Sequence, residues 1–96
     1  MHEDLDQVAR RVTELDAAVG SVRGEAYSSN GAVYVEVDLY GAITGLRLTE
    51  FAMERGAEEF ARLVAESHER AHTAALANAR LAHEAVRAQQ DSRGVW

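Results

Sequence analysis

The 96-residue sequence contains no cysteine and no long apolar run. Without cysteine, neither a disulfide framework nor a thiolate metal site can form, and the redox compartment cannot be inferred. No apolar run approaches the roughly 18 residues that a membrane-spanning helix needs. The N-terminal segment MHEDLDQVARR is acidic and helical in pattern, which is not typical of a signal peptide. We therefore expect a cytoplasmic protein.

Lysine is also absent, so all ten basic side chains are arginines, against sixteen Asp and Glu residues and a formal net charge of −6. Taken alone, this acidity argues against a protein that coats nucleic acid or an anionic membrane. Arginine, however, suits bidentate contacts with phosphate or carboxylate better than lysine does. Where the arginines cluster therefore matters more than their total number.

The stretch from Glu25 to Leu48 is the only part of the chain with the pattern of a β-sheet. Apolar and polar residues alternate from Val33 to Leu39, which predicts a strand with one buried face. Asn30-Gly31 precedes this strand and favours a type I′ hairpin turn. We therefore expect the run from Glu25 to Ser29 to pair with it as the first strand.

A second turn is predicted at Tyr40-Gly41, where glycine supplies backbone freedom. Residues Ile43 to Leu48 then return as a third strand. Ile43 and Leu46 fall on opposite sides of a regular pleat, which indicates a bulge at Gly45. These features together predict a three-stranded antiparallel meander.

Helical segments flank the meander on both sides. The first carries apolar residues at alternating steps of three and four from Leu5 to Val22, and we interpret Gly20 and Gly24 as its stop signals. The second runs from Ala57 to about Gln90 without proline or glycine and has an alanine-rich face. Small residues permit close helix–helix approach, so we expect this half to pair with another helix, within the chain or across a dimer.

The predicted fold class is α+β, with a long helix, a three-stranded antiparallel β-meander and a long helix (α-β-β-β-α). Residues 1–90 form one domain, and residues 91–96 form a flexible C-terminal tail with one exposed aromatic, Trp96. A chain this small leaves much apolar surface poorly covered, which favours a homodimer. The expected dimer interface consists of Leu5, Val8, Val12, Leu15, Val33, Val35 and Val37.

Across about residues 5–88, the chain resembles the YbaB/EbfC family of small nucleoid-associated proteins. The likeness is carried by the small-residue exit from the first helix, by NGAVYVEVDLYGAITGLRL and by the following helix GAEEFARLVAESHERAHTAA. The resemblance implies a tweezer-like homodimer in the nucleoid that binds duplex DNA with little sequence preference. Because some relatives lie beside specialised secretion systems, it also leaves open a protein–protein adaptor, possibly associated with a type VII system.

Residues 68–72, HERAH, match the H-E-x-x-H pattern of zinc metalloproteases, with His68 and His72 one helical turn apart. Such an enzyme also needs a third ligand from another element and a substrate cleft. His83 and Glu84 lie farther along the same helix and cannot supply that ligand. No nucleophile elbow or Gly-rich phosphate loop is present. We therefore expect no enzyme activity, no catalytic residue and no cofactor, and leave open adventitious metal binding by the two histidines.

Tyr34-x-x-x-Asp38 matches an element of type VII secretion substrates, where it follows a helical hairpin. Here both residues lie on the outward face of the predicted central strand, so strand alternation explains them.

Two groups of arginines are candidates for phosphate contacts. Arg10, Arg11 and Arg23 lie on the first helix and its exit, and Arg70, Arg80, Arg87 and Arg93 follow along the second helix and tail. We expect Arg10, Arg11, Arg23, Arg80 and Arg87 to contact DNA. The alternative is that each arginine pairs with neighbouring carboxylates, as Arg62 is expected to do with Glu58 and Glu66.

Overall fold

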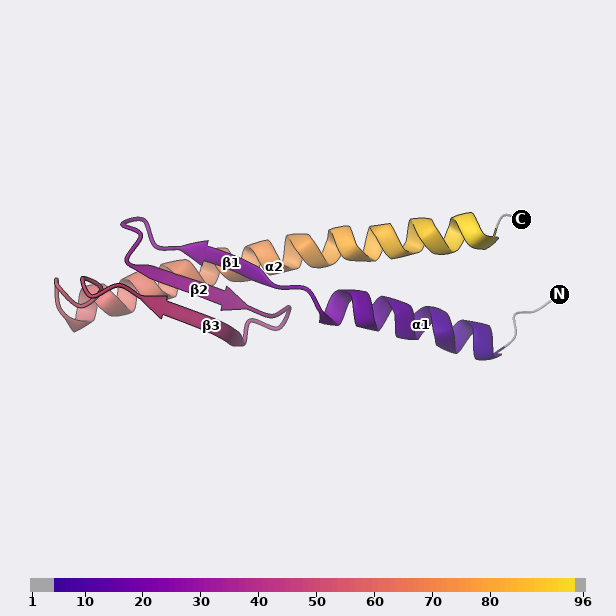
Figure 1. The fold of residues 1–96 in the computed structure, drawn as a ribbon, viewed down its shortest axis with the longest axis horizontal. Coiled ribbons are helices and arrows are strands. Elements are labelled where there is room, and N and C mark those ends of the chain that lie inside the picture. The colour runs from indigo at the N-terminus through magenta and orange to yellow at the C-terminus, as the bar shows by residue number, and fades with distance from the viewer. Residues whose placement is uncertain (1–4, 95–96) are drawn as a thin grey trace.

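The computed structural model describes residues 5–94 and shows a three-stranded antiparallel sheet of order β1-β2-β3, with one helix before it and one after it in the chain (Figure 1). The elements are α1 (Leu5–Gly20), β1 (Gly24–Tyr27), β2 (Val33–Val37), β3 (Ile43–Leu48) and α2 (Ala57–Gly94). The predicted α-β-β-β-α fold is confirmed. β2 ends two residues before the predicted Leu39, because Asp38 already begins the second turn.

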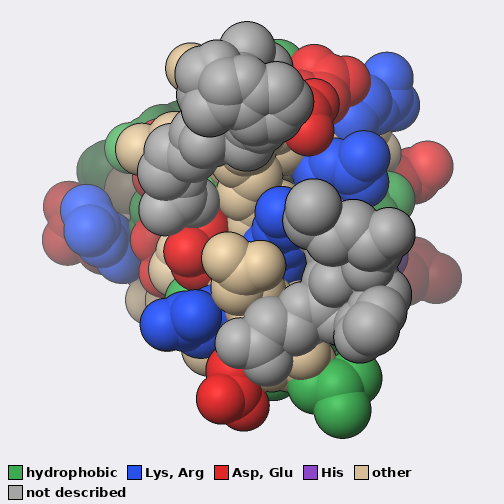
Figure 2. Space-filling view, turned by 90° about the vertical axis from the view of Figure 1, so that its right-hand side faces the viewer, with side chains coloured by type: hydrophobic (Ala, Val, Ile, Leu, Met, Phe, Trp, Pro, Cys, Tyr) green, Lys and Arg blue, Asp and Glu red, His purple; other side chains and the backbone are tan. Residues whose placement is uncertain are grey.

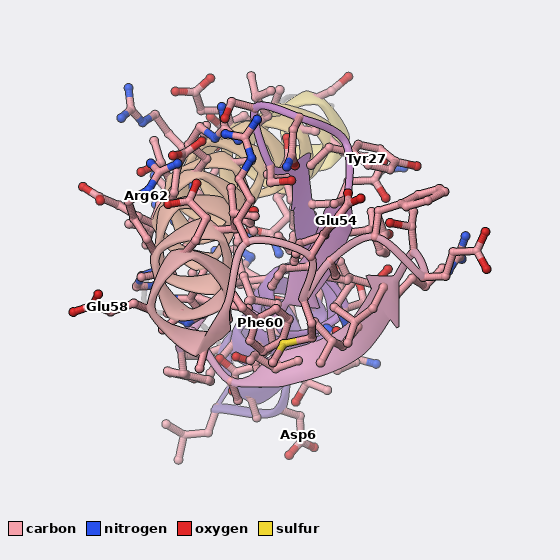
Figure 3. All side chains as sticks on the ribbon, turned by 90° about the vertical axis from the view of Figure 1, so that its left-hand side faces the viewer. Asp6, Tyr27, Glu54, Glu58, Phe60 and Arg62 are labelled. Atoms are coloured by element: carbon pink, nitrogen blue, oxygen red, sulfur yellow. The ribbon has the colours of Figure 1, made fainter. Side chains whose placement is uncertain are left out.

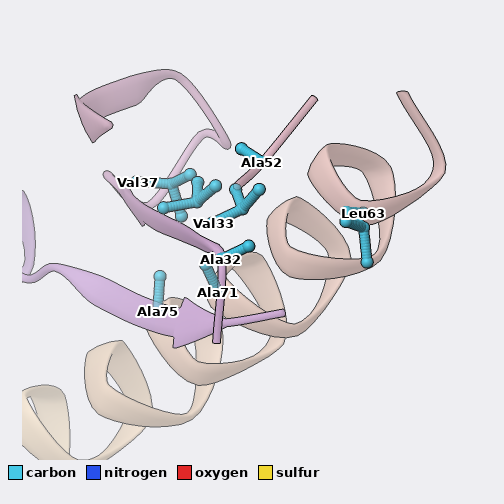
Figure 4. Packing of buried hydrophobic residues seen from close by; sticks show 8 residues of the cluster. Ala32, Val33, Val37, Ala52, Leu63, Ala71 and Ala75 are labelled. Atoms are coloured by element: carbon cyan, nitrogen blue, oxygen red, sulfur yellow. The ribbon is translucent and has the colours of Figure 1, made fainter. Parts of the chain in front are cut away.

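The core lies between the sheet and the first half of α2, which packs across β1 and β2 (Figure 1). Its side chains are small, and Figure 4 shows how they meet between the strand and the helix. The buried cluster consists of Ala32, Val33, Val35, Val37, Ala52, Leu63, Ala71 and Ala75. Burying one valine or leucine contributes about 1.5–3 kcal/mol, so this cluster is a modest core for a chain of this length.

Gly24 brings β1 unusually close to α2. A Cβ atom at this position would lie 2.1 Å from the carbonyl oxygen of Ala71 and 2.3 Å from the backbone nitrogen of Ala75. Only glycine allows this approach, because both neighbouring atoms belong to a helix backbone. Gly24 is therefore the first residue of a strand and a packing residue, which the interpretation as a stop signal missed.

The predicted hairpin between β1 and β2 is confirmed, but its turn is longer than a two-residue type I′ turn. The amide of Ser28 donates to the carbonyl of Val33 (2.8 Å), so four residues lie between this pair. Within the loop, the amide of Gly31, whose φ is +75°, donates to Ser28 O (2.9 Å). The Asn30 side chain accepts the amide proton of Ala32 (3.0 Å), which stabilises the longer loop.

The second turn is confirmed at Tyr40-Gly41. Gly41 has a φ of +84°, which favours glycine. The Asp38 carboxylate accepts hydrogen bonds from the amides of Tyr40 (2.9 Å) and Ala42 (3.0 Å). One aspartate therefore closes the loop that joins β2 to β3.

The bulge predicted at Gly45 is confirmed on β3, but one residue earlier. Glu36 pairs with Gly45, but the next residue, Val37, pairs with Ile43, so Thr44 is the extra residue on β3. The Thr44 hydroxyl donates to the Glu36 carboxylate (2.9 Å), which holds the bulge against β2.

The second half of α2 extends beyond the sheet and runs antiparallel to α1 of the same chain (Figure 1). The long helix therefore pairs within the chain. The molecule measures 65 × 19 × 16 Å, and its radius of gyration of 18.7 Å exceeds the roughly 13 Å of a compact domain of this size. α2 ends at Gly94, so residues 91–94 of the predicted tail are helical, and Trp96 lies outside the described residues. No helix in the described part is apolar enough to cross a membrane.

Candidate nucleic-acid interface

The projecting part of the molecule is a helical hairpin, which we call the arm: residues 5–23 and 77–94. The remainder, residues 24–76, is the body. Each helix of the arm contributes one face of small and apolar residues at steps of three and four, as the sequence pattern predicted. The half-buried or buried members are Leu15, Ala18 and Val19 on α1, and Ala79, Ala82 and Val86 on α2.

Two side-chain amides of α2 fix the register of the arm. Near its base, Asn78 Nδ2 donates to the backbone carbonyl of Arg23 (3.0 Å). Near its tip, Gln90 Nε2 donates to the carbonyl of Arg11 and to Glu14 Oε2, both at 3.2 Å. Neither residue was predicted from the sequence. Helical spacing could have identified Gln90 as a buried residue, because it lies on the same face of α2 as Ala79, Ala82 and Val86.

Charge is distributed unevenly between the arm and the body. The arm carries six of the ten arginines together with five carboxylates, whereas the body carries four arginines and nine carboxylates. Figure 2 looks at the tip of the arm, where arginines (blue) lie on several sides among the carboxylates (red). The negative net charge of the chain therefore resides mainly in the body.

The antiparallel register distributes the arm arginines from base to tip. The Asn78 and Gln90 contacts place Arg23 and Arg80 near the base, Arg87 farther out, and Arg10 and Arg11 near the tip. At 1.5 Å per helical residue, this set extends over roughly 20 Å, from Arg23 to Arg10. Arginines that the sequence placed in two separate groups are therefore brought onto one arm.

Five arginines of the arm are exposed to solvent. Arg10, Arg80 and Arg87 are exposed, and within residues 5–94 no ion pair engages them. Arg23 is exposed, and its guanidinium donates to the carbonyls of Gly20 and Val22 at the end of α1. Arg11 is exposed as well. The side chain of Arg93 is outside the part that the structure describes.

Two arginines of the body, Arg62 and Arg70, form ion pairs with neighbouring carboxylates. Arg62 forms ion pairs with Glu59 (2.6 Å) and Glu66 (3.0 Å). The predicted pairing with Glu66 is confirmed, but Glu59 takes the place expected for Glu58, which projects into solvent (Figure 3). The hydrogen bond between Arg62 and Glu59 lowers the pKa of Glu59 and raises the pKa of Arg62. Arg70 donates to the carbonyl of Tyr27 and pairs with Glu66.

The two histidines of the HERAH segment dock the β2–β3 loop onto α2. His68 Nε2 bonds the carbonyl of Gly41 (2.7 Å), and His72 Nε2 bonds that of Leu39 (3.0 Å). Within the described residues, no group of three or more potential ligands for a metal ion exists. The pattern that resembles a zinc protease therefore has a structural explanation.

Tyr34 and Asp38 also have local roles. The Tyr34 hydroxyl donates to Glu25 (2.5 Å), and this bond raises the pKa of the phenol to about 12. Arg47 lies over the Tyr34 ring, 4.9 Å from its centroid. Asp38 closes the second turn. The secretion-signal pattern is therefore accounted for by contacts within the sheet.

An apolar surface lies beside β3, which α2 does not cover. Leu46 and Leu48 pair with Val35 and Val33, so they point to the same side as the core, yet both are 48% exposed. We call this the β3 surface. Its large exposed side chains are Ile43, Leu46, Leu48, Phe51 and Met53.

The seven residues expected at a dimer interface differ widely in their exposure to solvent. Val33, Val35 and Val37 are fully buried within the single chain, so no surface of theirs is left for a partner. Leu15 is half-buried in the arm. Leu5, Val8 and Val12 are exposed near the tip of the arm. Sequence alternation identified buried positions but could not tell the chain's own core from an interface.

A two-layer α+β body with a projecting helical hairpin defines the architectural class of this protein. Residues 1–90 match the YbaB/EbfC DNA-binding family, and the chain belongs to this family, which is not one of enzymes. Among solved structures, the chain is similar to uncharacterized protein HP0035 from Helicobacter pylori, with 16% identity and a TM-score of 0.57. The match covers 79% of this chain and 89% of that one, and it shows the fold alone. No curated protein matches the sequence.

Proposed function

We propose that this protein binds duplex DNA with little sequence preference, as a homodimer in the bacterial nucleoid, within the cytoplasm. The observation that carries the proposal is the concentration of exposed arginines on the arm of a member of a DNA-binding family. Neutralising phosphates releases counterions, which is the main source of affinity in sequence-independent binding. The residues proposed to contact phosphates are Arg10, Arg11, Arg23, Arg80 and Arg87.

Two features of the arm favour a duplex bound through its backbone. Arginine contacts to phosphate position a protein on DNA but carry no direct sequence information. The described arm also contains no phenylalanine, tyrosine or tryptophan. Single-stranded DNA is usually held by stacking its bases on aromatic side chains, so the arm lacks the means for that mode of binding.

The β3 surface supports the homodimer. Contiguous exposed apolar side chains on a small chain commonly mark a protein interface. In the proposed dimer, a second copy covers Ile43, Leu46, Leu48, Phe51 and Met53. Phe60, half-buried between α2 and the sheet, lies near this surface (Figure 3). Two-fold association would double the number of arms, and with it the number of phosphates that one particle can neutralise.

Fluorescence anisotropy with two labelled duplexes of unrelated sequence tests this proposal. At about 50 mM salt we expect the protein to bind both with similar affinity, and the binding to weaken steeply as salt is added. If the protein is instead a protein–protein adaptor, it should bind neither duplex, because the arginines of the arm do not overcome the repulsion between the net negative charge of the chain and phosphate. Absence of binding at this low salt would overturn the proposal.

A further inference from the structure

We propose that Gln90 is a positioning residue: its side chain forms a clasp that sets the spacing of the two helices of the arm, and thereby the spacing of the arginines. The proposal rests on the proposed DNA binding for its functional consequence, but the clasp itself is a feature of the free protein. Gln90 is 8% exposed, so it is one of few buried polar side chains in the described residues. Its contacts join residues that are 76 and 79 positions apart in sequence.

The chemistry of the clasp requires a donor at position 90. An amide NH2 group has two protons, which here serve the Arg11 carbonyl and the Glu14 carboxylate. Both partners are acceptors only, so a carboxylate at position 90 would oppose two acceptors without a proton to share. A neutral amide also avoids the cost of burying an unpaired charge. Glutamine therefore combines burial with two donated bonds.

The clasp lies where apolar packing between the helices becomes weak. Leu15 is half-buried, whereas Val12 is 52% exposed and Leu5 is 82% exposed. The Asn78 contact fixes the base of the arm, twelve residues before Gln90, which corresponds to about 18 Å along α2. With so little apolar contact near the tip, the polar clasp determines whether the helices stay together there.

Spacing matters because Arg10 and Arg11 lie on α1 while Arg80 and Arg87 lie on α2. If the helices part, the two sets of arginines no longer face the same stretch of backbone together. Only molecules with a closed arm would then make the full set of phosphate contacts. The apparent affinity falls in proportion to the closed fraction, so a closed fraction of about one in ten gives about tenfold weaker binding.

Charge-matched variants test this role. Gln90→Glu removes both donated bonds and adds one negative charge. Gln89→Glu adds the same charge at an exposed neighbouring position. The exchange variant, Glu14→Gln with Gln90→Glu, restores wild-type composition and net charge and lets an amide at 14 donate to a carboxylate at 90.

The first readout is the arm spacing in the absence of DNA. Because the chain has no cysteine, Gln7→Cys and Ser92→Cys provide a unique pair of spin-label sites, one on each helix, and dilution with unlabelled protein isolates distances within one chain. We expect a single narrow distance in the wild type and in Gln89→Glu, and a longer and broader distribution in Gln90→Glu. The exchange variant should recover in part, because it restores the bond between positions 14 and 90 but not the bond to the Arg11 carbonyl. An unchanged distribution in Gln90→Glu overturns the proposal.

The second readout is duplex binding by the same variants. We expect Gln90→Glu to bind about tenfold more weakly than Gln89→Glu, with a smaller salt dependence, and the exchange variant to recover part of the affinity. Equal binding by Gln90→Glu and Gln89→Glu would overturn the positioning role. A wild-type protein that binds no DNA would overturn the proposed function instead, and the spin-label distances would still decide whether Gln90 is a clasp.

Discussion

Gly24 lies directly against the backbone of α2, where a side chain would not fit. We expect Gly24→Ala to lower the free energy of unfolding by about 3 kcal/mol, because the added Cβ would overlap the backbone of Ala71 and Ala75. Urea denaturation at one fixed protein concentration measures this change.

Gly20→Ala is the matched control. Gly20 ends α1, and a Cβ there would meet nothing within 4 Å. Alanine is the better helix former, so we expect Gly20→Ala to be neutral or to stabilise by up to about 1 kcal/mol. Similar losses in both variants would mean that the close approach of β1 to α2 is not what requires glycine at position 24.

Tyr34 provides a second test at the residue scale. Its pKa is raised to about 12, first by the hydrogen bond to Glu25 and then by burial. A raised phenol pKa stabilises the fold at every pH below the unfolded value of about 10, and this contribution is lost as the pH rises toward 12.

In a variant with Tyr27→Phe and Tyr40→Phe, Tyr34 is the sole tyrosine, and its ionisation is followed by ultraviolet absorbance. We expect a midpoint near 12, and a lower midpoint after Glu25→Gln removes the charged acceptor. A midpoint that is insensitive to Glu25→Gln would show that this hydrogen bond does not hold the phenol proton.

At the scale of elements, the sequence was sufficient to predict all five elements and the bulge on β3. Period-two alternation and glycine placement are local signals, and they located the strands to within a few residues. The hairpin turn was predicted too short, because the side chains of Ser28 and Asn30 replace backbone partners within the loop. The His68 and His72 contacts were not predictable, since they join α2 to a loop about 30 residues away.

β3 is the element that the single chain leaves uncovered, and it makes the dimer testable. Light scattering at low micromolar concentration should give about twice the chain mass of 10.5 kDa. Leu46→Asp on the β3 surface should shift the mass toward that of one chain, because two-fold association would bury an unpaired carboxylate. Leu81→Asp introduces the same charge at an exposed leucine of the arm and should leave the dimer intact. A dimer that dissociates equally in both variants would contradict the assignment of the β3 surface.

At the scale of the whole molecule, the arrangement of charge carries the functional argument. Net charge and composition indicate an acidic protein, which argues against DNA binding. The structure separates an acidic body from an arm that carries most of the arginines. The sequence places these arginines on two helices but does not show that the helices lie side by side, because the contacts between them, such as those of Asn78 and Gln90, join residues 55 and 79 positions apart.

The most direct test of the arm as the DNA-binding surface is the salt dependence of duplex binding in single-arginine variants. Arg80→Ala and Arg87→Ala should each reduce the slope of log K against log salt by about 0.9 for each phosphate that the variant no longer neutralises. Arg55→Ala removes the same charge from the exposed surface of the body and should leave the slope of the wild type unchanged. Equal slopes for the arm and body variants would contradict the central claim that the arm binds the phosphates.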